Sequence, residues 1–253
     1  MTAQQVAAAR RHFKLMGGAR VETDHAQIAS DPGRPSVWDA NLAFAKPGAD
    51  PARFLAEVRE QLAGADSLVV IADALTDPAI EAALALAGFA VCQQLIEMVA
   101  ERIDLPAPPP PVSLIPVADD ASRATFAALI EADFAEGRRT GAMDAATADG
   151  LMAQMLGRAG YYRIIMSGGV PQGYGMAMVC PGRLGLIENL FTLPAARGQG
   201  LMSAFIAAVT EDLRDAGCDA VFLDAHADQP PKQLYARLGF VPVAMARTWV
   251  MAD

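Results

Sequence analysis

Apolar residues recur at helical spacing in two distant parts of the chain. The spacing is seen at Phe54, Val58 and Leu62, and it returns between Leu201 and Leu213. Residues four apart lie on one face of an α-helix. Each series therefore predicts a helix whose apolar face packs on a sheet.

The elements that follow these two helices also match. A short apolar run comes next in each case, Leu68–Ile71 and Ala220–Leu223, and its length is typical of a buried strand. A second helical segment then ends at the dipeptide Gly-Phe, and a closing apolar strand completes the unit. The two parts thus predict the same order of elements.

The likeness extends to residue identity. When the chain is shifted by 151 positions, residues 54–99 align with 205–250 without a gap, and 14 of the 46 pairs are identical. The identical pairs include Asp73 with Asp224 and Gly88 with Gly239. This agreement predicts two tandem copies of one fold unit.

The region before the second copy's helix contains further predicted elements. We expect a strand at 112–117, helices at 121–135 and 145–158, and strands at 161–166, 174–179 and 186–192. The resulting order is β-α-α-β-β-β-α-β-α-β. It predicts an α/β (α+β) fold with a mixed central sheet and helices on both faces.

A proline tract at residues 105–111 divides the two copies. Its prolines lack N–H donors and fix φ, so the tract is typical of an extended linker. We therefore expect domains at 1–104 and 112–253. A proline-rich loop inside a single domain is the alternative.

Composition narrows the class of protein. The chain has 253 residues, 53% of them hydrophobic, which excludes general disorder. Its net charge of −9 argues against a nucleic-acid partner, since such partners need clustered Lys and Arg. No apolar run is long enough to span a membrane. Three cysteines at irregular spacing favour a reduced, cytoplasmic location.

The clearest candidate for chemistry joins the strand at 186–192 to the helix that begins at Leu201. We name residues Arg197–Met202 the candidate phosphate loop. Its glycines allow close backbone approach, and the first N–H groups of a helix have no internal partners. These donors and Arg197 favour a phosphate group.

The same loop sequence fits two other structures less well. An ordinary strand–helix connection would look similar. The dinucleotide-binding pattern G-x-G-x-x-G is nearly met, but its third glycine is Ser203, and too few elements follow for a doubly wound sheet. A Walker loop is absent from the sequence.

Three segments resemble one known family, the GCN5-related N-acetyltransferases (GNAT). Arg197–Met202 is similar to the family's R-x-x-G-x-[GA] loop, Leu234–Phe240 to its L-Y-x-[KR]-x-G-F signature, and Ile187–Thr192 to its central strand. The resemblance covers residues 112–253. It departs from the pattern at Met202, which ends the loop with a larger residue, and at Asp228, where many members have asparagine.

The resemblance implies an acyltransferase that moves an acetyl group from acetyl-CoA to a primary amine of a small molecule or peptide. It assigns Tyr235 as the acid that protonates the leaving thiolate. Glu188 is our candidate for the base, with His226 in reserve. The structural alternatives are that Tyr235 is a packing residue and that Glu188 faces solvent.

The acetyl-CoA contacts expected are Phe191, Thr192, Leu193, Arg197, Gly198, Gln199, Gly200, Leu201 and Met202. The three histidines lack the spacing of a metal site, so no metal is expected.

The resemblance also places the amine acceptor near Phe134, Arg138, Arg139 and Thr140. The two arginines suggest an acceptor that carries a carboxylate or phosphate, whereas solvated surface arginines are the alternative.

The first copy lacks these features. Residues 45–51 replace the candidate phosphate loop and contain two prolines and Asp50, while Leu84 takes the place of Tyr235. We expect this half to support the second copy, to shape the substrate cleft or to form a homodimer. A second hypothesis for the whole chain is a non-catalytic module that binds acyl-CoA or regulates.

Overall fold

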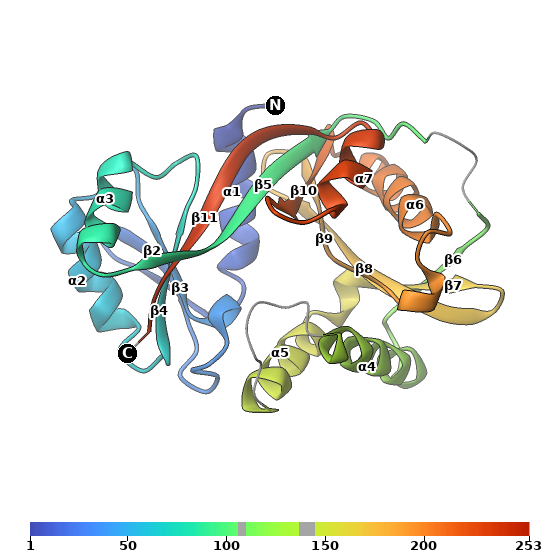
Figure 1. Ribbon diagram of the computed structural model, residues 1–253, viewed down its shortest axis with the longest axis horizontal. Coiled ribbons are helices and arrows are strands. Elements are labelled where there is room, and N and C mark those ends of the chain that lie inside the picture. Colours follow the sequence, from blue (N-terminus) through green and yellow to red (C-terminus); the bar gives the residue numbers. More distant parts are fainter. Residues whose placement is uncertain (106–109, 137–144, 253) are drawn as a thin grey trace. The chain divides into compact units, whose positions relative to one another are not determined.

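The computed structural model describes residues 1–105, 110–136 and 145–252 (Figure 1). In chain order the elements are α1 (Ala3–Lys14), β1 (Ala19–Glu22), β2 (Ala26–Ser30), η1 (Trp38–Ala40), β3 (Leu42–Ala45), α2 (Pro51–Gln61), β4 (Ser67–Ala72), α3 (Pro78–Leu86), β5 (Ala90–Ala100), β6 (Ser113–Pro116), α4 (Asp120–Ala135), α5 (Ala145–Gly157), η2 (Ala159–Tyr161), β7 (Tyr162–Ser167), β8 (Val170–Cys180), β9 (Leu184–Thr192), η3 (Pro194–Ala196), α6 (Leu201–Asp215), β10 (Ala220–His226), α7 (Pro231–Arg237) and β11 (Val241–Ala252). The order predicted for the C-terminal half is confirmed from β6 to β11.

The chain forms two compact units. The first unit comprises residues 1–98, 224–232 and 242–253, and the second comprises 99–223 and 233–241. The chain therefore returns to the first unit near its C-terminus. The division into segments 1–104, 105–111 and 112–253 stays a prediction, and residues 106–109 of the proline tract lie outside the described residues.

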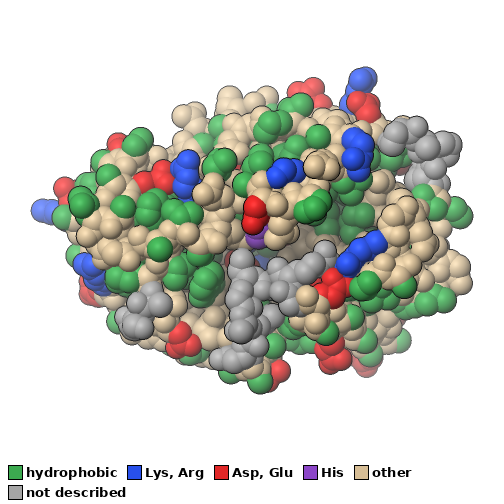
Figure 2. All heavy atoms as spheres, in the orientation of Figure 1, with side chains coloured by type: hydrophobic (Ala, Val, Ile, Leu, Met, Phe, Trp, Pro, Cys, Tyr) green, Lys and Arg blue, Asp and Glu red, His purple; other side chains and the backbone are tan. Residues whose placement is uncertain are grey.

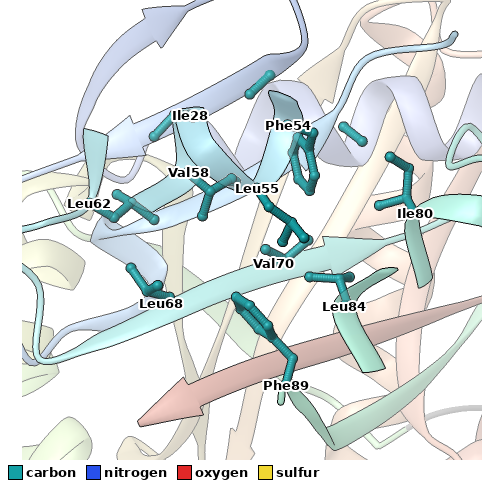
Figure 3. Packing of buried hydrophobic residues seen from close by; sticks show 13 residues of the cluster. Ile28, Phe54, Leu55, Val58, Leu62, Leu68, Val70, Ile80, Leu84 and Phe89 are labelled. Atoms are coloured by element: carbon teal, nitrogen blue, oxygen red, sulfur yellow. The ribbon is translucent and has the colours of Figure 1, made fainter. Parts of the chain in front are cut away.

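The first unit contains a mixed sheet with helices on both faces. Strands β1, β2 and β3 are antiparallel neighbours, and β3 is parallel to β4. Val70 of β4 packs in one core cluster with side chains of α2 and α3 (Figure 3). Its neighbours Val69 and Ile71 pack in another cluster with Leu15, which follows α1. Because successive strand residues point to opposite faces, α1 covers the face opposite α2 and α3.

The closing strands of the two copies are exchanged. The repeat makes β4 equivalent to β10 and β5 equivalent to β11, so each copy was expected to close with its own strand. Instead, β11 is antiparallel to β4, and β5 lies between β11 and β10 in the strand order. The expectation was wrong because repeat similarity identifies equivalent elements, whereas pairing partners depend on which strand edge lies nearby.

The part of the sheet that belongs to the second unit is also mixed. Strand β10 is parallel to β9, and the pairs from β9 to β6 are antiparallel. Tyr174 contacts Phe126 of α4, whereas a Cβ at the adjacent Gly175 would lie 2.4 Å from the ring of Phe205 on α6. Helices α4 and α6 therefore cover opposite faces, as predicted. The missing side chain at Gly175 allows α6 to pack closely on the sheet.

Helix α1 buries two adjacent arginines that serve both copies. Arg11 forms two hydrogen bonds with Asp73, from Nη2 at 2.6 Å and from Nε at 2.7 Å. Arg10 lies 2.9 Å from Asp224 and 3.5 Å from Glu97. Asp73 and Asp224 are equivalent in the repeat, because they are 151 positions apart. One turn of α1 thus neutralises the same aspartate in each copy.

Glu97 is a second carboxylate beside Arg10. Its side chain is fully buried on β5. Burial raises the pKa of Glu97 to about 7; the negative charges of Asp224 and Asp73 contribute to this shift, and Arg10 opposes it. The Glu97 carboxyl group therefore changes its protonation state near neutral pH.

Glu97→Gln should stabilise the protein at alkaline pH. The folded-state pKa of about 7 lies above the ordinary glutamate value of 4.5, so the folded chain binds the proton more tightly. The stability that Glu97 contributes is full below pH 4.5 and is lost as the pH rises to 7. We expect the variant to gain on the order of 2–3 kcal/mol of unfolding free energy at pH 8 and almost none at pH 4.5. Urea unfolding at both pH values measures the difference, and exposed Glu60→Gln is the control. An equal gain at both pH values would contradict the prediction.

Residues 112–253 produced alone should not form a stable monomer. This segment lacks β4 and β5, which neighbour β11 and β10 in the full chain. Unpaired strand edges leave backbone groups without partners and promote association. We expect aggregates or oligomers in size-exclusion chromatography and no cooperative thermal unfolding, in contrast to the full chain. A monomer that unfolds cooperatively would refute this.

Candidate active site

The candidate phosphate loop lies on the surface between η3 and α6. Arg197, Gly198, Gln199 and Gly200 are exposed. Gly198 and Gly200 have φ of 75° and 79°, which is the left-handed region that favours glycine. Gly200 is the N-cap of α6 and provides no side-chain cap. The first N–H groups of α6 therefore have no intrahelical acceptor and no capping side chain, so they can bind an anion.

The equivalent helix in the first copy is capped differently. Asp50 is the N-cap of α2, and its carboxylate accepts a hydrogen bond from the Arg53 N–H at 2.9 Å. Pro51, the first residue of α2, has no N–H to offer. A carboxylate of the chain thus caps the N-terminus of α2, whereas the N-terminus of α6 has no side-chain cap.

Arg197 has an acidic partner. Its Nη2 lies 2.5 Å from both carboxylate oxygens of Glu136, which follows α4, and its Nε donates to the Thr192 carbonyl at 3.1 Å. A phosphate group approaching the loop would compete with Glu136 for the guanidinium. Glu136 could not be identified from the sequence, because its contact with Arg197 forms only when α4 packs beside the loop.

The end of the proline tract also reaches the loop. A Cβ at Gly200 would lie 3.3 Å from Cδ of Pro110. A larger side chain at Gly200 would therefore press on Pro110. The second glycine of the loop thus has a packing reason in addition to its positive φ.

Strand β9 contains a bulge in its middle. The register with β8 shifts between Tyr174 and Met176, and Asn189 has φ of 52°. The Asn189 side-chain amide donates to the Tyr162 hydroxyl at 2.8 Å and thereby holds this conformation. Asparagine is one of the few residues that tolerate positive φ, so Asn189 within a strand pattern was an available signal of a bulge.

The ladder between β9 and β10 is short. It pairs Leu184–Leu186 with Ala220–Phe222. From Ile187 onward, the register assigns no β10 partner to the described residues of β9. Along its other edge, β9 stays paired with β8, and the Leu193 N–H donates to the Gln172 carbonyl at 2.9 Å. The second half of β9 thus has one edge outside the ladder, and the Leu193 amide is already used within the protein.

Glu188 lies next to the bulge. The register places it opposite Met176, on the face that also carries Tyr174 and α4. Glu188 is half-buried, and its Oε2 atom is fully buried. The Oε2 atom therefore does not face solvent, and the role of Glu188 stays a prediction.

Tyr235 lies on α7 and is 7% exposed. Its ring packs edge-on against Phe240 at 6.1 Å. The Gly239 N–H donates to the Ala236 carbonyl and the Phe240 N–H to the Tyr235 carbonyl, a turn that fixes the end of α7. Tyr235, Glu188 and the candidate phosphate loop all belong to the second unit.

The predicted acceptor region is only partly described. Phe134 is half-buried near the end of α4, whereas Arg138, Arg139 and Thr140 lie outside the described residues. One turn of α4 also carries Asp133, which accepts a 2.7 Å hydrogen bond from the buried Tyr174 hydroxyl. This buried pair could not be predicted from the sequence, because its residues are 41 positions apart.

His226, the reserve base, lies in the first unit. Its Nε2 is 3.3 Å from the side-chain nitrogen of Gln93.

Within the described residues, no group of three or more His, Cys, Asp or Glu side chains is arranged to bind a metal. None of the described helices has the length and apolarity required to cross a bilayer. On the face in Figure 2, acidic and basic side chains are interspersed.

Comparison with known proteins identifies the family. Residues 124–240 match the model of the acetyltransferase (GNAT) family and belong to it. No curated protein matches the chain. Among solved structures, a GCN5-related N-acetyltransferase from Kribbella flavida is similar, with a TM-score of 0.70 and 19% identity over 98% of this chain and 95% of that one.

Two further structures share the fold of the whole chain. A tandem GNAT protein from the clavulanic acid biosynthesis pathway has a TM-score of 0.57 and 15% identity over 100% of this chain and 97% of its own. A protein of unknown function from Staphylococcus epidermidis has a TM-score of 0.65 and 15% identity over 93% and 94% of the two chains. The chain therefore has a tandem GNAT fold.

Gly198→Ala should weaken acetyl-CoA binding, whereas Gly48→Ala should not. Both glycines have φ of 75°, and a Cβ at either one would meet nothing within 4 Å. Each substitution forces alanine into the left-handed region at a cost of about 1–2 kcal/mol. Only Gly198 belongs to the candidate phosphate loop, so we expect about tenfold weaker binding for that variant alone, a difference of about 1.4 kcal/mol. Calorimetric titration of both variants measures it, and equal effects would count against the loop as the site.

Proposed function

We propose that residues 112–253 transfer an acetyl group from acetyl-CoA to a primary amine of a small molecule or peptide. The observation that carries the proposal is the contrast between the two copies. The N-terminus of α6 is exposed and has no side-chain cap, whereas Asp50 caps α2. Membership of residues 124–240 in the GNAT family supports the same activity.

In this proposal the diphosphate of acetyl-CoA binds at the candidate phosphate loop. The N–H groups of Gly198–Met202 donate to it, and the Arg197 guanidinium turns to it from Glu136. Phe191, Thr192 and Leu193 of the β9 segment run beside the pantetheine arm. The edge of β9 after Leu186 lies outside the ladder with β10, and the arm would add along it as a strand adds to a sheet edge.

The proposed chemistry is direct attack. The amine nitrogen forms a bond with the thioester carbon, and the carbon–sulfur bond breaks as the tetrahedral intermediate collapses. Glu188 takes the ammonium proton, directly or through water, and Tyr235 donates a proton to the leaving thiolate. The second proton that the nitrogen loses as the amide forms restores the Tyr235 hydroxyl. The half-buried position of Glu188 and the nearly buried position of Tyr235 support these roles.

The cysteines favour direct attack over an acyl-cysteine intermediate. Burial raises the pKa of Cys180 to about 12, and it raises the pKa of Cys92 and Cys218 as well. These are the three cysteines of the chain. A thiol rather than a thiolate is a poor nucleophile, so none of them is poised to accept the acetyl group.

The same proposal includes the setting of the enzyme. We place the activity in the cytoplasm, with no metal, nucleic acid or membrane as partner. The first copy supports the second instead of binding a second acetyl-CoA, and self-association as a homodimer is a further role open to it. One acetyl-CoA bound per chain in a titration is the expected stoichiometry, and two would refute the degenerate role of the first copy.

Tyr235→Phe separates catalysis from binding. We expect acetyl-CoA affinity within twofold of wild type and turnover reduced about 100-fold, a typical loss for a positioned general acid. Release of the free coenzyme A thiol across a panel of primary amines measures turnover, and calorimetry measures affinity. Tyr161→Phe, on a half-exposed turn, is the control. Wild-type binding without turnover on any amine would instead favour the alternative, a non-catalytic acyl-CoA-binding or regulatory module.

A further inference from the structure

The two arginines of α1 lie in different electrostatic settings. Arg11 pairs with Asp73, and it also donates to the Ala45 carbonyl at 2.8 Å and to the Thr76 hydroxyl at 3.3 Å. Within the described residues, Asp73 is the one carboxylate that pairs with Arg11. Arg10 instead lies between two carboxylates, Asp224 at 2.9 Å and Glu97 at 3.5 Å.

The two aspartates belong to strands that differ in their relation to the candidate active site. Asp73 follows β4, which belongs to the copy without a phosphate loop. Asp224 lies on β10, two residues after Phe222, the last β10 residue that pairs with β9. Strand β9 in turn carries Glu188 and leads into the candidate phosphate loop. A displacement of β10 would therefore also move β9, because the two strands are paired, and would alter the proposed acetyl-CoA site.

Strand β10 joins the two units. Its residues up to Leu223 belong to the second unit, and those from Asp224 onward belong to the first. The Asp224 side chain is 8% exposed, and that of Arg10 is 1% exposed. An ion pair this well buried is weakly screened and costs several kcal/mol when one partner is removed. Arg10 thus holds β10 at the point where the strand leaves the second unit.

We propose that Arg10 is a positioning residue for acetyl-CoA binding: helix α1 of the degenerate copy fixes the end of β10 through Asp224. This inference rests on the proposed function, since it assumes that the second unit binds acetyl-CoA. It assigns the first copy a defined task. That copy supplies the cation that keeps β10, and through it β9, in register.

The different charge balance around the two arginines provides a test. The variant that loses more thermal stability should be the one that loses less affinity for acetyl-CoA. Asp224→Asn leaves Arg10 beside Glu97, so the buried cation keeps a carboxylate. Asp73→Asn leaves Arg11 with neutral oxygens only. The Asp73 variant should therefore lose more thermal stability, whereas the Asp224 variant should lose more affinity for acetyl-CoA.

The experiment compares the two full-length variants with wild type. We expect Tm to fall by about 5 °C or more for Asp73→Asn and by less for Asp224→Asn. We expect the acetyl-CoA Kd to rise about fivefold to tenfold for Asp224→Asn and to stay within twofold for Asp73→Asn. Calorimetry is performed at a temperature at which every variant is folded. A role in stability alone would make the loss of affinity follow the loss of Tm, and that result would overturn the inference.

Amide hydrogen exchange gives a readout that needs no acetyl-CoA. Asp224→Asn should speed exchange in β10 and β9, and Asp73→Asn should speed it in β4. Arg10→Lys and Arg11→Lys form a second matched pair, in which only the Arg10 variant should weaken binding. If the wild-type protein does not bind acetyl-CoA, the proposed function is wrong. If amide exchange in β10 is unchanged in Asp224→Asn, the positioning role of Arg10 is wrong.

Discussion

Two adjacent guanidinium groups buried on one helix require two nearby carboxylates, and this requirement organises the first unit. Arg10 and Arg11 meet Asp224 and Asp73, which are equivalent positions of the repeat. Unpaired, either charge would cost several kcal/mol of stability. Because Asp224 lies on the strand that leaves the second unit, pairing it with Arg10 requires the end of β10 to join the first unit. The exchange of β5 and β11 between the copies is consistent with this arrangement.

The two copies differ chemically at the N-terminus of one equivalent helix. Both α2 and α6 follow a buried strand and pack an apolar face on a sheet. Asp50 satisfies an N–H of α2 internally, whereas Gly200 leaves those of α6 exposed. In the first copy, the positive end of the helix dipole therefore interacts with a carboxylate of the chain. In the second copy, it is accessible to the anion of a ligand. In the proposed function, this difference is what distinguishes a binding copy from a supporting copy.

The sequence predicted the elements well and the site in part. Helical spacing, short apolar runs and glycine turns gave the confirmed order from β6 to β11, and the Arg197–Met202 and Leu234–Phe240 motifs identified the family. The roles of Glu188, Tyr235 and the loop residues stay predictions. Glu136, Asn189 and Tyr162 were missed because their meaning depends on contacts between segments. Arg197, for example, was identified as a positive charge at the loop, whereas its partner Glu136 lies 61 positions away in the sequence.

The sequence by itself determined the local features: which segments are helices or strands, where the repeat lies, and which loop has glycines before an uncapped helix. These follow from periodicity, propensity and residue chemistry over a few neighbouring positions. The tertiary structure alone decided which closing strand pairs with which copy and which carboxylate each arginine meets. Strand pairing and buried ion pairs join residues far apart in the chain, and two similar copies offer each edge two acceptable partners. Only the folded arrangement selects between them.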